Sequence, residues 1–233
     1  MLEDEQEDII GKALRAQRLN PTDIGLKYSD ALHALTTDQL HQAAKVLNLK
    51  ASALVKLGEP FATLSLPKEV EMITSSFGHL GVNAFYVTME DYRFLIDTGT
   101  ELNKVSHLSP DTILITHNHP DHTACLNHFS TTVIHPKPTV DLSAFNIQTF
   151  DVSGHSTPSL AYYFPQLSIP CCFVGDAIFK RSIGGCSNKK NYAAALTNVT
   201  TMLRSLPPET ILCVGHGPNT TVANELEENP FFL

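Results

Sequence analysis

Four residues of the types that bind metal ions lie within six positions of the sequence. His117, His119, Asp121 and His122 form an H-x-H-x-D-H pattern at the end of the apolar run 112–116. Imidazole and carboxylate groups are the natural protein ligands of zinc and related divalent ions. Because residues two apart in an extended chain point to the same side, His117 and His119 are placed to bind one ion. Asp121 and His122 enter a predicted helix start and can reach a second ion, so the pattern predicts a metal site.

Three further candidate ligands each follow a predicted strand and stand beside a glycine. They are His155 in Gly154-His155-Ser156, Asp176 in Gly175-Asp176-Ala177-Ile178-Phe179, and His216 in Gly215-His216-Gly217-Pro218. A glycine next to a ligand lets the backbone bend or approach another chain segment closely. Each motif alone is typical of an ordinary loop, but four strand-end sites in one chain indicate a shared centre.

Many short strands with helices between them are expected to position these residues. A hairpin is predicted from the strand-like runs 83–88 and 92–97, which flank Met89-Glu90-Asp91. The pattern indicates an α/β fold with two sheets in the middle and helices outside. Further strands are expected at 112–116, 133–134, 147–152, 160–164, 171–174 and 211–214, and a helix at 192–206.

The order of these motifs resembles the metallo-β-lactamase superfamily, and among its members the glyoxalase II-type (hydroxyacylglutathione hydrolase-like) thioesterases. The resemblance covers about residues 60–233 and implies a four-layer αβ/βα sandwich with metals at one sheet edge. The segment Ile96-Asp97-Thr98-Gly99 resembles a family turn that supports the metal loop from behind. The segment from Glu225 to Phe231 resembles the tail of small glyoxalase II-like members.

This resemblance implies a site for two divalent ions, with zinc expected and iron or manganese as alternatives. One ion would be bound by His117, His119 and His155, the other by Asp121, His122 and His216, with Asp176 bridging both. A hydroxide held between the ions would attack a carbonyl carbon of a thioester or ester. Asp121 is also the candidate catalytic residue that orients the hydroxide or shuttles its proton.

The first 58 residues are predicted to form a separate small all-α domain, followed by the hydrolase domain at 59–233. Asn20-Pro21-Thr22-Asp23 has the form of a helix start, and Thr36-Thr37-Asp38-Gln39 allows a capping box. This segment resembles small helix-turn-helix bundles. Its seven Lys/Arg and eight Asp/Glu give it a balance of -1, whereas a DNA reader is basic. We therefore favour a docking or dimerising role, including a homodimer formed through this domain.

The net charge and the composition of the chain restrict the kinds of molecule that it is expected to bind. The net charge of -8 and pI near 5.7 disfavour a nucleic-acid partner. No apolar run has the length of a membrane span, and the acidic N-terminus is unlike a signal peptide, so a cytoplasmic location is expected. A small anionic thioester is the expected substrate. Its candidate contacts are Lys180, Arg181, Lys189, Lys190 and Tyr192.

Two other functions stay open at this point. A persulfide dioxygenase-like enzyme would share the same motifs and use one iron, held by His117, His155 and Asp176. A sensor or regulatory protein would use the metal domain to detect a ligand and the helical domain to bind DNA or a partner. The metal content per chain separates the first alternative from a binuclear hydrolase.

Overall fold

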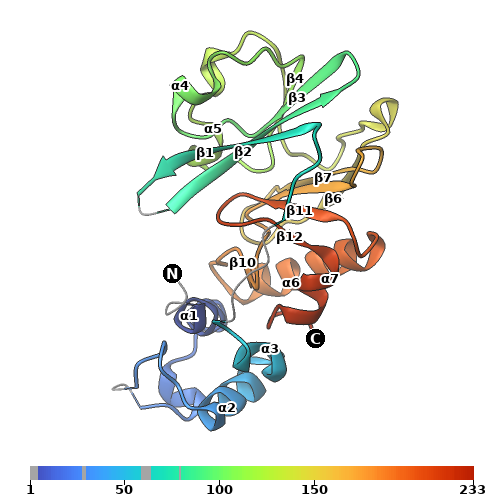
Figure 1. Ribbon diagram of the computed structural model, residues 1–233. Coiled ribbons are helices and arrows are strands. Elements are labelled where there is room, and N and C mark those ends of the chain that lie inside the picture. The colour runs from blue at the N-terminus through green and yellow to red at the C-terminus, as the bar shows by residue number, and fades with distance from the viewer. Residues whose placement is uncertain (1–4, 28–29, 59–63, 79) are drawn as a thin grey trace.

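Residues 70–134 build the first of two sheets that face each other (Figure 1). The sheet has the order β1-β2-β3-β4-β5, in which the first three strands pair antiparallel and the last three parallel. Its strands are β1 (Val70–Phe77), β2 (Leu80–Met89), β3 (Tyr92–Ile96), β4 (Thr112–Leu114) and β5 (Thr132–Ile134). The structure is a computed structural model that describes residues 5–27, 30–58, 64–78 and 80–233.

The second sheet comes from the later part of the chain and has the order β12-β11-β8-β7-β6. The β8–β11 pair is parallel and the other pairs are antiparallel. A short hairpin of β9 (Ile178–Phe179) and β10 (Ser182–Ile183) follows β8 directly. The sheet strands are β6 (Gln148–Asp151), β7 (Leu160–Phe164), β8 (Cys171–Gly175), β11 (Ile211–Val214) and β12 (Thr220–Thr221).

An aromatic core lies between the two sheets. Phe85, Phe94, Phe164 and Phe173 belong to one buried cluster, and their rings pack edge to face at centroid separations of 5.2–5.6 Å. Such aromatic pairs contribute beyond the area they bury, because ring edges are attracted to ring faces. The sandwich is therefore held at its centre by side chains from both sheets.

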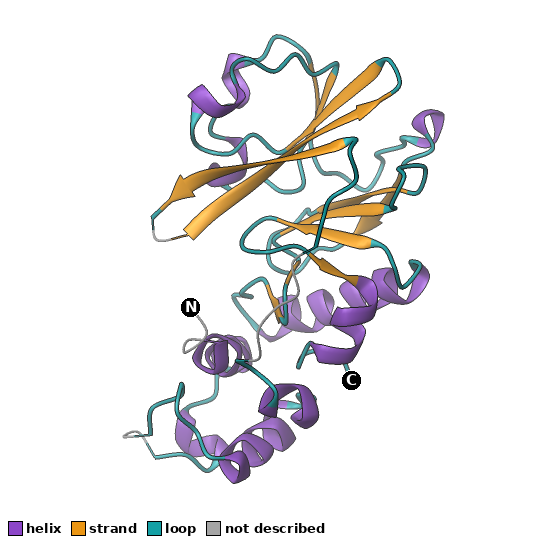
Figure 2. Ribbon diagram, viewed as in Figure 1, coloured by secondary structure: helices purple, strands orange, loops and turns teal. Residues whose placement is uncertain are grey.

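Helices cover the outer faces of the sandwich (Figure 2). The first sheet carries the short helices α4 (Leu102–Val105) and α5 (Pro120–Thr123), and the second carries α6 (Lys189–Ser205) and α7 (Val222–Glu228). Single turns of 3-10 helix occur at η2 (Leu126–His128) and η3 (Ser143–Phe145). This layering confirms the expected αβ/βα sandwich. None of the described helices is long and apolar enough to cross a membrane.

The N-terminal segment is helical, as predicted. It contains α1 (Glu5–Gln17), η1 (Pro21–Ile24), α2 (Thr37–Leu47) and α3 (Ala51–Val55). The capping box at the start of α2 is present, with the Thr36 hydroxyl accepting from the Gln39 backbone. The predicted start at Asn20-Pro21 opens only one 3-10 turn, because Gly25 takes a left-handed conformation with φ of 80° and ends it.

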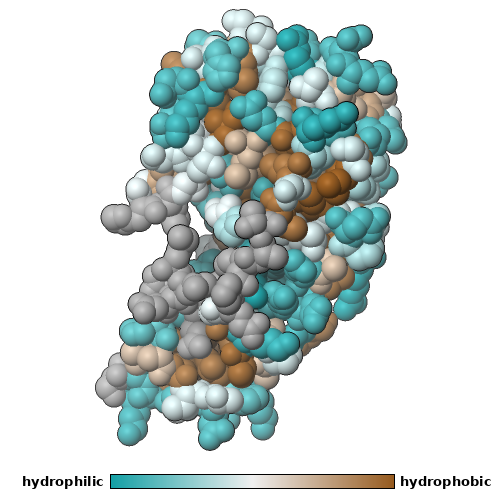
Figure 3. All heavy atoms as spheres, viewed as in Figure 1, coloured by the Kyte–Doolittle hydropathy of each residue, from teal (hydrophilic) through white to brown (hydrophobic). Residues whose placement is uncertain are grey.

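The helical segment packs on the second sheet and its helices. Buried residues of α1 and α2 share one hydrophobic cluster with residues of α6, α7 and the C-terminal tail. The division into domains at residues 58 and 59 remains a proposal, and its boundary borders residues 59–63, which lie outside the described residues. On the face shown in Figure 3, hydrophobic residues gather in a patch on the sandwich and in a smaller one on the helical segment, and hydrophilic residues border both.

Candidate metal centre

Loops that follow strands of both sheets meet at one edge of the sandwich. The segment with His117 and His119 follows β4 of the first sheet, and α5 begins directly after it at Pro120. His155 lies between β6 and β7, Asp176 follows β8, and His216 follows β11, all in the second sheet. The topology therefore brings together residues that are up to 99 positions apart, which the four motifs predicted.

The first group of candidate ligands contains His117, His119, His155 and Asp176. His119 Nδ1 lies 3.1 Å from His117 Nε2 and 3.2 Å from His155 Nε2. The Asp176 carboxylate oxygen Oδ2 lies 3.6 Å from His155 Nε2 and 4.0 Å from His117 Nε2. Three imidazole nitrogens and one carboxylate thus converge on a single point, as ligands of one ion do.

The second group contains Asp121, His122 and His216. His216 Nε2 lies 3.1 Å from Asp121 Oδ2, and His122 Nε2 lies 3.7 Å from the same oxygen. Asp176 also approaches this group, with Oδ1 at 3.2 Å from His122 Nε2 and Oδ2 at 3.4 Å from His216 Nε2. Its carboxylate therefore stands between the two groups, in the position from which it can bridge two ions.

The outward-facing nitrogens of the histidines are held by the surrounding protein. His155 Nδ1 donates to the Gly185 carbonyl at 2.8 Å, and His216 Nδ1 donates to the Gly81 carbonyl at 2.6 Å. A carbonyl only accepts, so each ring carries its proton on Nδ1 and directs the lone pair of Nε2 toward the cluster. These bonds set the tautomer that a metal ligand needs.

Asp97 supports the metal loop from the first sheet. Its carboxylate accepts from the Thr116 backbone and hydroxyl, each at 2.8 Å, and from His122 Nδ1 at 2.7 Å. Asp97 is buried and has a left-handed backbone with φ of 57°. This conformation aims the carboxylate back at the loop and fixes the orientation of His122.

Two glycines leave room for the ligands. A Cβ at Gly215 would overlap the Asp176 carboxylate, and one at Gly184 would overlap the Asp176 backbone carbonyl and lie 2.7 Å from the His155 ring. Real Cβ atoms do not approach other atoms this closely, so both positions exclude any side chain. The motif glycine at position 215 is thus required by close packing against the ligands.

Two buried atoms at the centre test whether a metal fits. His122 Nε2 and Asp176 Oδ1 are fully buried, and neither makes a hydrogen bond of acceptable geometry with the described residues. Buried polar atoms without a partner cost free energy. A cation between the two groups satisfies both atoms, and the histidine and carboxylate donor set suits zinc or iron. The residues therefore fit a divalent metal centre.

Burial and charge shift the pKa values of the cluster in opposite directions. Burial, helped by the nearby His122, lowers the pKa of His117 to about 2. Burial also acts to lower the pKa of His122, but the carboxylates of Asp97 and Asp176 outweigh it and raise that pKa to about 10. Burial opposes ionisation of Asp176, but its interactions with His122 and His216 hold its pKa well below the usual range. Asp176 is therefore a fixed negative charge at the centre.

The structure places the predicted substrate contacts outside the ligand cluster. Arg181 is buried, and its guanidinium pairs with Glu228 at 2.9 Å. Lys180 is half-buried, and Lys189 and Lys190 are exposed at the start of α6. Tyr192 is buried and, with Lys189, lines a cavity of about 280 Å³ against residues 17, 47 and 48. None of the seven candidate ligands lines this cavity, so substrate contact by these five residues stays a prediction.

Two aromatic rings flank His216 and were not singled out from the sequence. The Phe179 ring on β9 lies 5.9 Å from the His216 ring, and the Phe77 ring at the end of β1 lies 6.4 Å from it. Phe77 is 46% exposed. Phe179 falls within the quoted Asp176 motif, but nothing in the spacing of Phe77 indicated its place. Both rings form apolar walls beside the candidate ligands.

A two-sheet sandwich with five histidines and two aspartates gathered at its edge is the architecture of a metallo-hydrolase. The comparisons with known proteins agree, since residues 77–170 match the family model described as the metallo-beta-lactamase superfamily. Residues 77–170 of this chain are therefore similar to the metallo-β-lactamase domain, which agrees with the two-sheet sandwich and the ligand cluster at its edge.

The relatives found by sequence comparison align with different lengths of this chain. A probable metallo-hydrolase of Bacillus subtilis is 25% identical over 199 residues, which cover 66% of this chain and 93% of the relative. A hydroxyacylglutathione hydrolase of Erythrobacter litoralis is 35% identical over 80 residues, covering 34% of this chain and 30% of the relative. The chain spans between 30% and 50% of the length of that enzyme and the one from Wigglesworthia glossinidia.

Solved structures show the same fold. The crystal structure of TTHA1623 in a di-iron-bound form is 28% identical, with a TM-score of 0.53, and covers 69% of this chain and 100% of that one. The BLEG-1 B3 metallo-beta-lactamase is 23% identical with a TM-score of 0.56, and covers 70% of this chain and 98% of that one. At this identity the second likeness shows the fold alone.

Proposed function

We propose that this chain is a binuclear metal-dependent hydrolase that cleaves a thioester or ester of a small molecule, in the manner of glyoxalase II. The observation that carries the proposal is Asp176, whose carboxylate approaches histidines of both ligand groups within 4.0 Å. The hydroxyacylglutathione hydrolases among the relatives support a thioester substrate. The cytoplasmic location belongs to the same proposal.

The proposal gives each residue a task. His117, His119 and His155 hold one divalent ion, Asp121, His122 and His216 hold the other, and Asp176 serves both. Two divalent ions in such a site lower the pKa of a bound water to about 7 and polarise a carbonyl oxygen. Zinc is expected, and the di-iron form of TTHA1623 makes iron the leading alternative.

Asp121 has a second task in this scheme. It is buried, and its Oδ2 faces His122 and His216 at 3.7 and 3.1 Å. A carboxylate in that position can orient the attacking water and hold the proton that the water releases. The polar atoms of the cluster are thus divided between holding ions and moving one proton.

Metal content per chain is the first experiment. Elemental analysis of the protein purified without added metal should give about two ions per chain, and Asp176→Asn should lose most of both. Asp91→Asn in the exposed β2–β3 turn serves as the matched control. One iron per chain and no second ion would move the chain to oxygen-dependent persulfide chemistry, whereas no metal uptake at all would exclude catalysis by this site.

Thioester hydrolysis is measured next on the loaded protein. A panel of acyl thioesters followed by thiol release should show turnover that stops on metal removal and returns on reloading. Asp121→Asn should lower kcat by about a hundredfold while KM changes little. Full turnover in a variant that keeps both ions would remove the proton-handling role from Asp121.

A further inference from the structure

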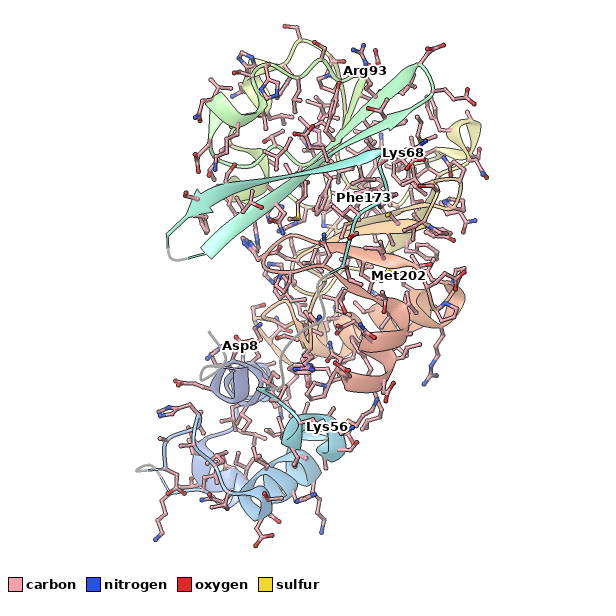
Figure 4. All side chains as sticks on the ribbon, in the orientation of Figure 1. Asp8, Lys56, Lys68, Arg93, Phe173 and Met202 are labelled. Atoms are coloured by element: carbon pink, nitrogen blue, oxygen red, sulfur yellow. The ribbon has the colours of Figure 1, made fainter. Side chains whose placement is uncertain are left out.

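Helix α1 of the N-terminal segment contacts the hairpin that follows Asp176. Lys12 Nζ donates to Ser182 Oγ on β10 at 2.9 Å and pairs with Asp8 Oδ2 at 2.7 Å. The Ser182 hydroxyl in turn donates to Asp8 Oδ2 at 2.9 Å. Figure 4 shows Asp8 on α1, on the side that faces β10. A closed triangle of polar contacts therefore joins two segments that are 170 residues apart in the sequence.

The ammonium group of Lys12 also lies over an aromatic ring that adjoins the metal site. Its Nζ is 5.1 Å from the centroid of the Phe179 ring, within the range of a cation–π contact. The Phe179 ring is 5.9 Å from the His216 ring. One side chain thus separates the cation from a candidate metal ligand.

The positive charge of Lys12 also acts on Cys186, in the loop that follows the β9–β10 hairpin. This charge partly offsets the burial that raises the pKa of the Cys186 thiol to about 11. Cys186 is adjacent to Gly185, whose carbonyl holds His155. Lys12 therefore contacts the β9–β10 hairpin directly, and its charge also acts on the thiol of Cys186 in the neighbouring loop.

The ammonium group has capacity for one more acceptor. A lysine carries three N–H donors, and two acceptors, Asp8 and Ser182, are found among the described residues. Its side chain is 13% exposed, so its charge is only partly screened by solvent and salt. Arg181, a cation in the turn of the β9–β10 hairpin, is buried and pairs with Glu228.

We propose that Lys12, supplied by the N-terminal helical segment, is a specificity-determining residue that binds a carboxylate on the substrate. The proposal rests on the proposed function and narrows its substrate class to thioesters that carry a carboxylate away from the scissile bond. The rings of Phe77 and Phe179 beside His216 would contact the apolar part of the substrate that lies between its carboxylate and its thioester. The negative charge of Asp8 partly offsets the attraction of the same ammonium group for the substrate carboxylate.

Because Asp8 and Lys12 carry opposite charges, substitutions of the two residues should change the binding of an anionic substrate in opposite directions. If the pair acts on an anionic substrate, Lys12→Met weakens its binding and Asp8→Asn strengthens it, because the second change removes an opposing negative charge. If the triangle only fastens α1 to β10, both changes loosen the same contact and act in the same direction. The sign of the Asp8→Asn effect separates the two roles.

The experiment uses the metal-loaded full-length chain and matched substrates. One pair is S-acetyl-3-mercaptopropionate and its uncharged amide, and the other is a succinyl thioester and its succinamoyl counterpart. Lys12→Met should raise KM about tenfold for the anionic member of at least one pair, with kcat and the neutral member unchanged. Asp8→Asn should lower that KM, Lys12→Arg should keep most of the preference, and Lys45→Met on the exposed face of α2 should match the wild type.

Binding without turnover provides an independent measurement. The thioether S-propyl-3-mercaptopropionate cannot be hydrolysed, and calorimetry should show it binding about tenfold more weakly to Lys12→Met, with no change for its amide. Equal losses for anionic and neutral compounds would overturn the role of Lys12 and leave the hydrolase intact. If no thioester is hydrolysed, the proposed function fails, and an unchanged thioether affinity in Lys12→Met then overturns this inference separately.

Discussion

Gly184 and Gly185 are neighbours in the sequence, but only one of them has room for a side chain. A Cβ at Gly184 would meet the Asp176 carbonyl and the His155 ring, whereas a Cβ at Gly185 has no atom within 4 Å among the described residues. Gly184→Ala should therefore displace His155 and lower the bound metal to about one ion or less per chain. Elemental analysis after desalting measures this, with Gly185→Ala as the neighbouring control. Equal metal content in both variants would contradict the packing argument.

Asp97 is the residue whose carboxylate orients His122. In Asp97→Asn the amide nitrogen meets donors on Thr116 and His122 in place of an acceptor, so the ring loses its fixed orientation. Loss of such a supporting group lowers metal affinity by about 10–100-fold. Competition with a chromophoric chelator measures the change, and Asp91→Asn is the control. An affinity within twofold of the wild type would show that His122 is positioned by other contacts.

Among elements, helix α7 ties the C-terminal tail to the β9–β10 hairpin through Glu225, a residue of its first turn. Its buried carboxylate accepts from the Arg181 backbone, the Thr220 hydroxyl and the Asn229 amide. Burial outweighs these donors and raises the pKa of Glu225 to about 7. The unfolded chain ionises this group near pH 4.5, so its contribution to stability is complete below that pH and is lost as pH rises through 7.

Glu225→Gln should remove this pH dependence. Between pH 4.5 and 8 the wild type should lose about 3 kcal/mol of unfolding free energy through this group, and the variant should show no such loss. Denaturant unfolding at several pH values, at equal metal loading, gives the difference between the two. Glu227→Gln, exposed on the same helix, is expected to follow the wild type. Parallel curves for all three proteins would mean that Glu225 stays ionised in the folded state.

The elements that carry the ligands were predictable because apolar runs mark buried strands. The runs at 160–164 and 211–214 match β7 and β11 residue for residue. Strand β1 was not predicted, because it forms the edge of its sheet and Glu71, Met72 and Thr74 do not alternate clearly between polar and apolar. A one-sided, exposed strand leaves little periodicity in the sequence.

The ligands of the candidate site were predictable from the sequence, but not all of the contacts around them were. Its seven ligands fall in short motifs, so local spacing indicated them all. The contacts of Lys12 could not be predicted, because they depend on how α1 packs against a hairpin 170 residues later. Contacts between distant segments follow from the folded topology, and no short pattern records them.

At the scale of the whole molecule, the helical segment and the sandwich are expected to unfold together. They share one hydrophobic cluster, and Lys50 Nζ donates to the Leu226 carbonyl at 2.7 Å, near the C-terminal end of α7. Lys50→Met should lower the unfolding free energy by about 1 kcal/mol, since a cation at a helix C-terminus is stabilising. Helical circular dichroism and residual hydrolysis should report the same single transition on heating, with exposed Lys56→Met as the control. Two separate transitions would show that the segment is an independent unit.

Each candidate ligand group draws on both sheets. His117, His119, Asp121 and His122 follow a strand of the first sheet, whereas His155, Asp176 and His216 belong to the second. Asn83 adds a link at this edge, donating from its side chain to the Val214 and Gly217 carbonyls. An ion bound by either group would join the two sheets, so its release is expected to require local opening of the sandwich. The rate at which a chelator removes the metal should reach a plateau as the chelator concentration rises, because opening of the sandwich then limits the loss of the ion.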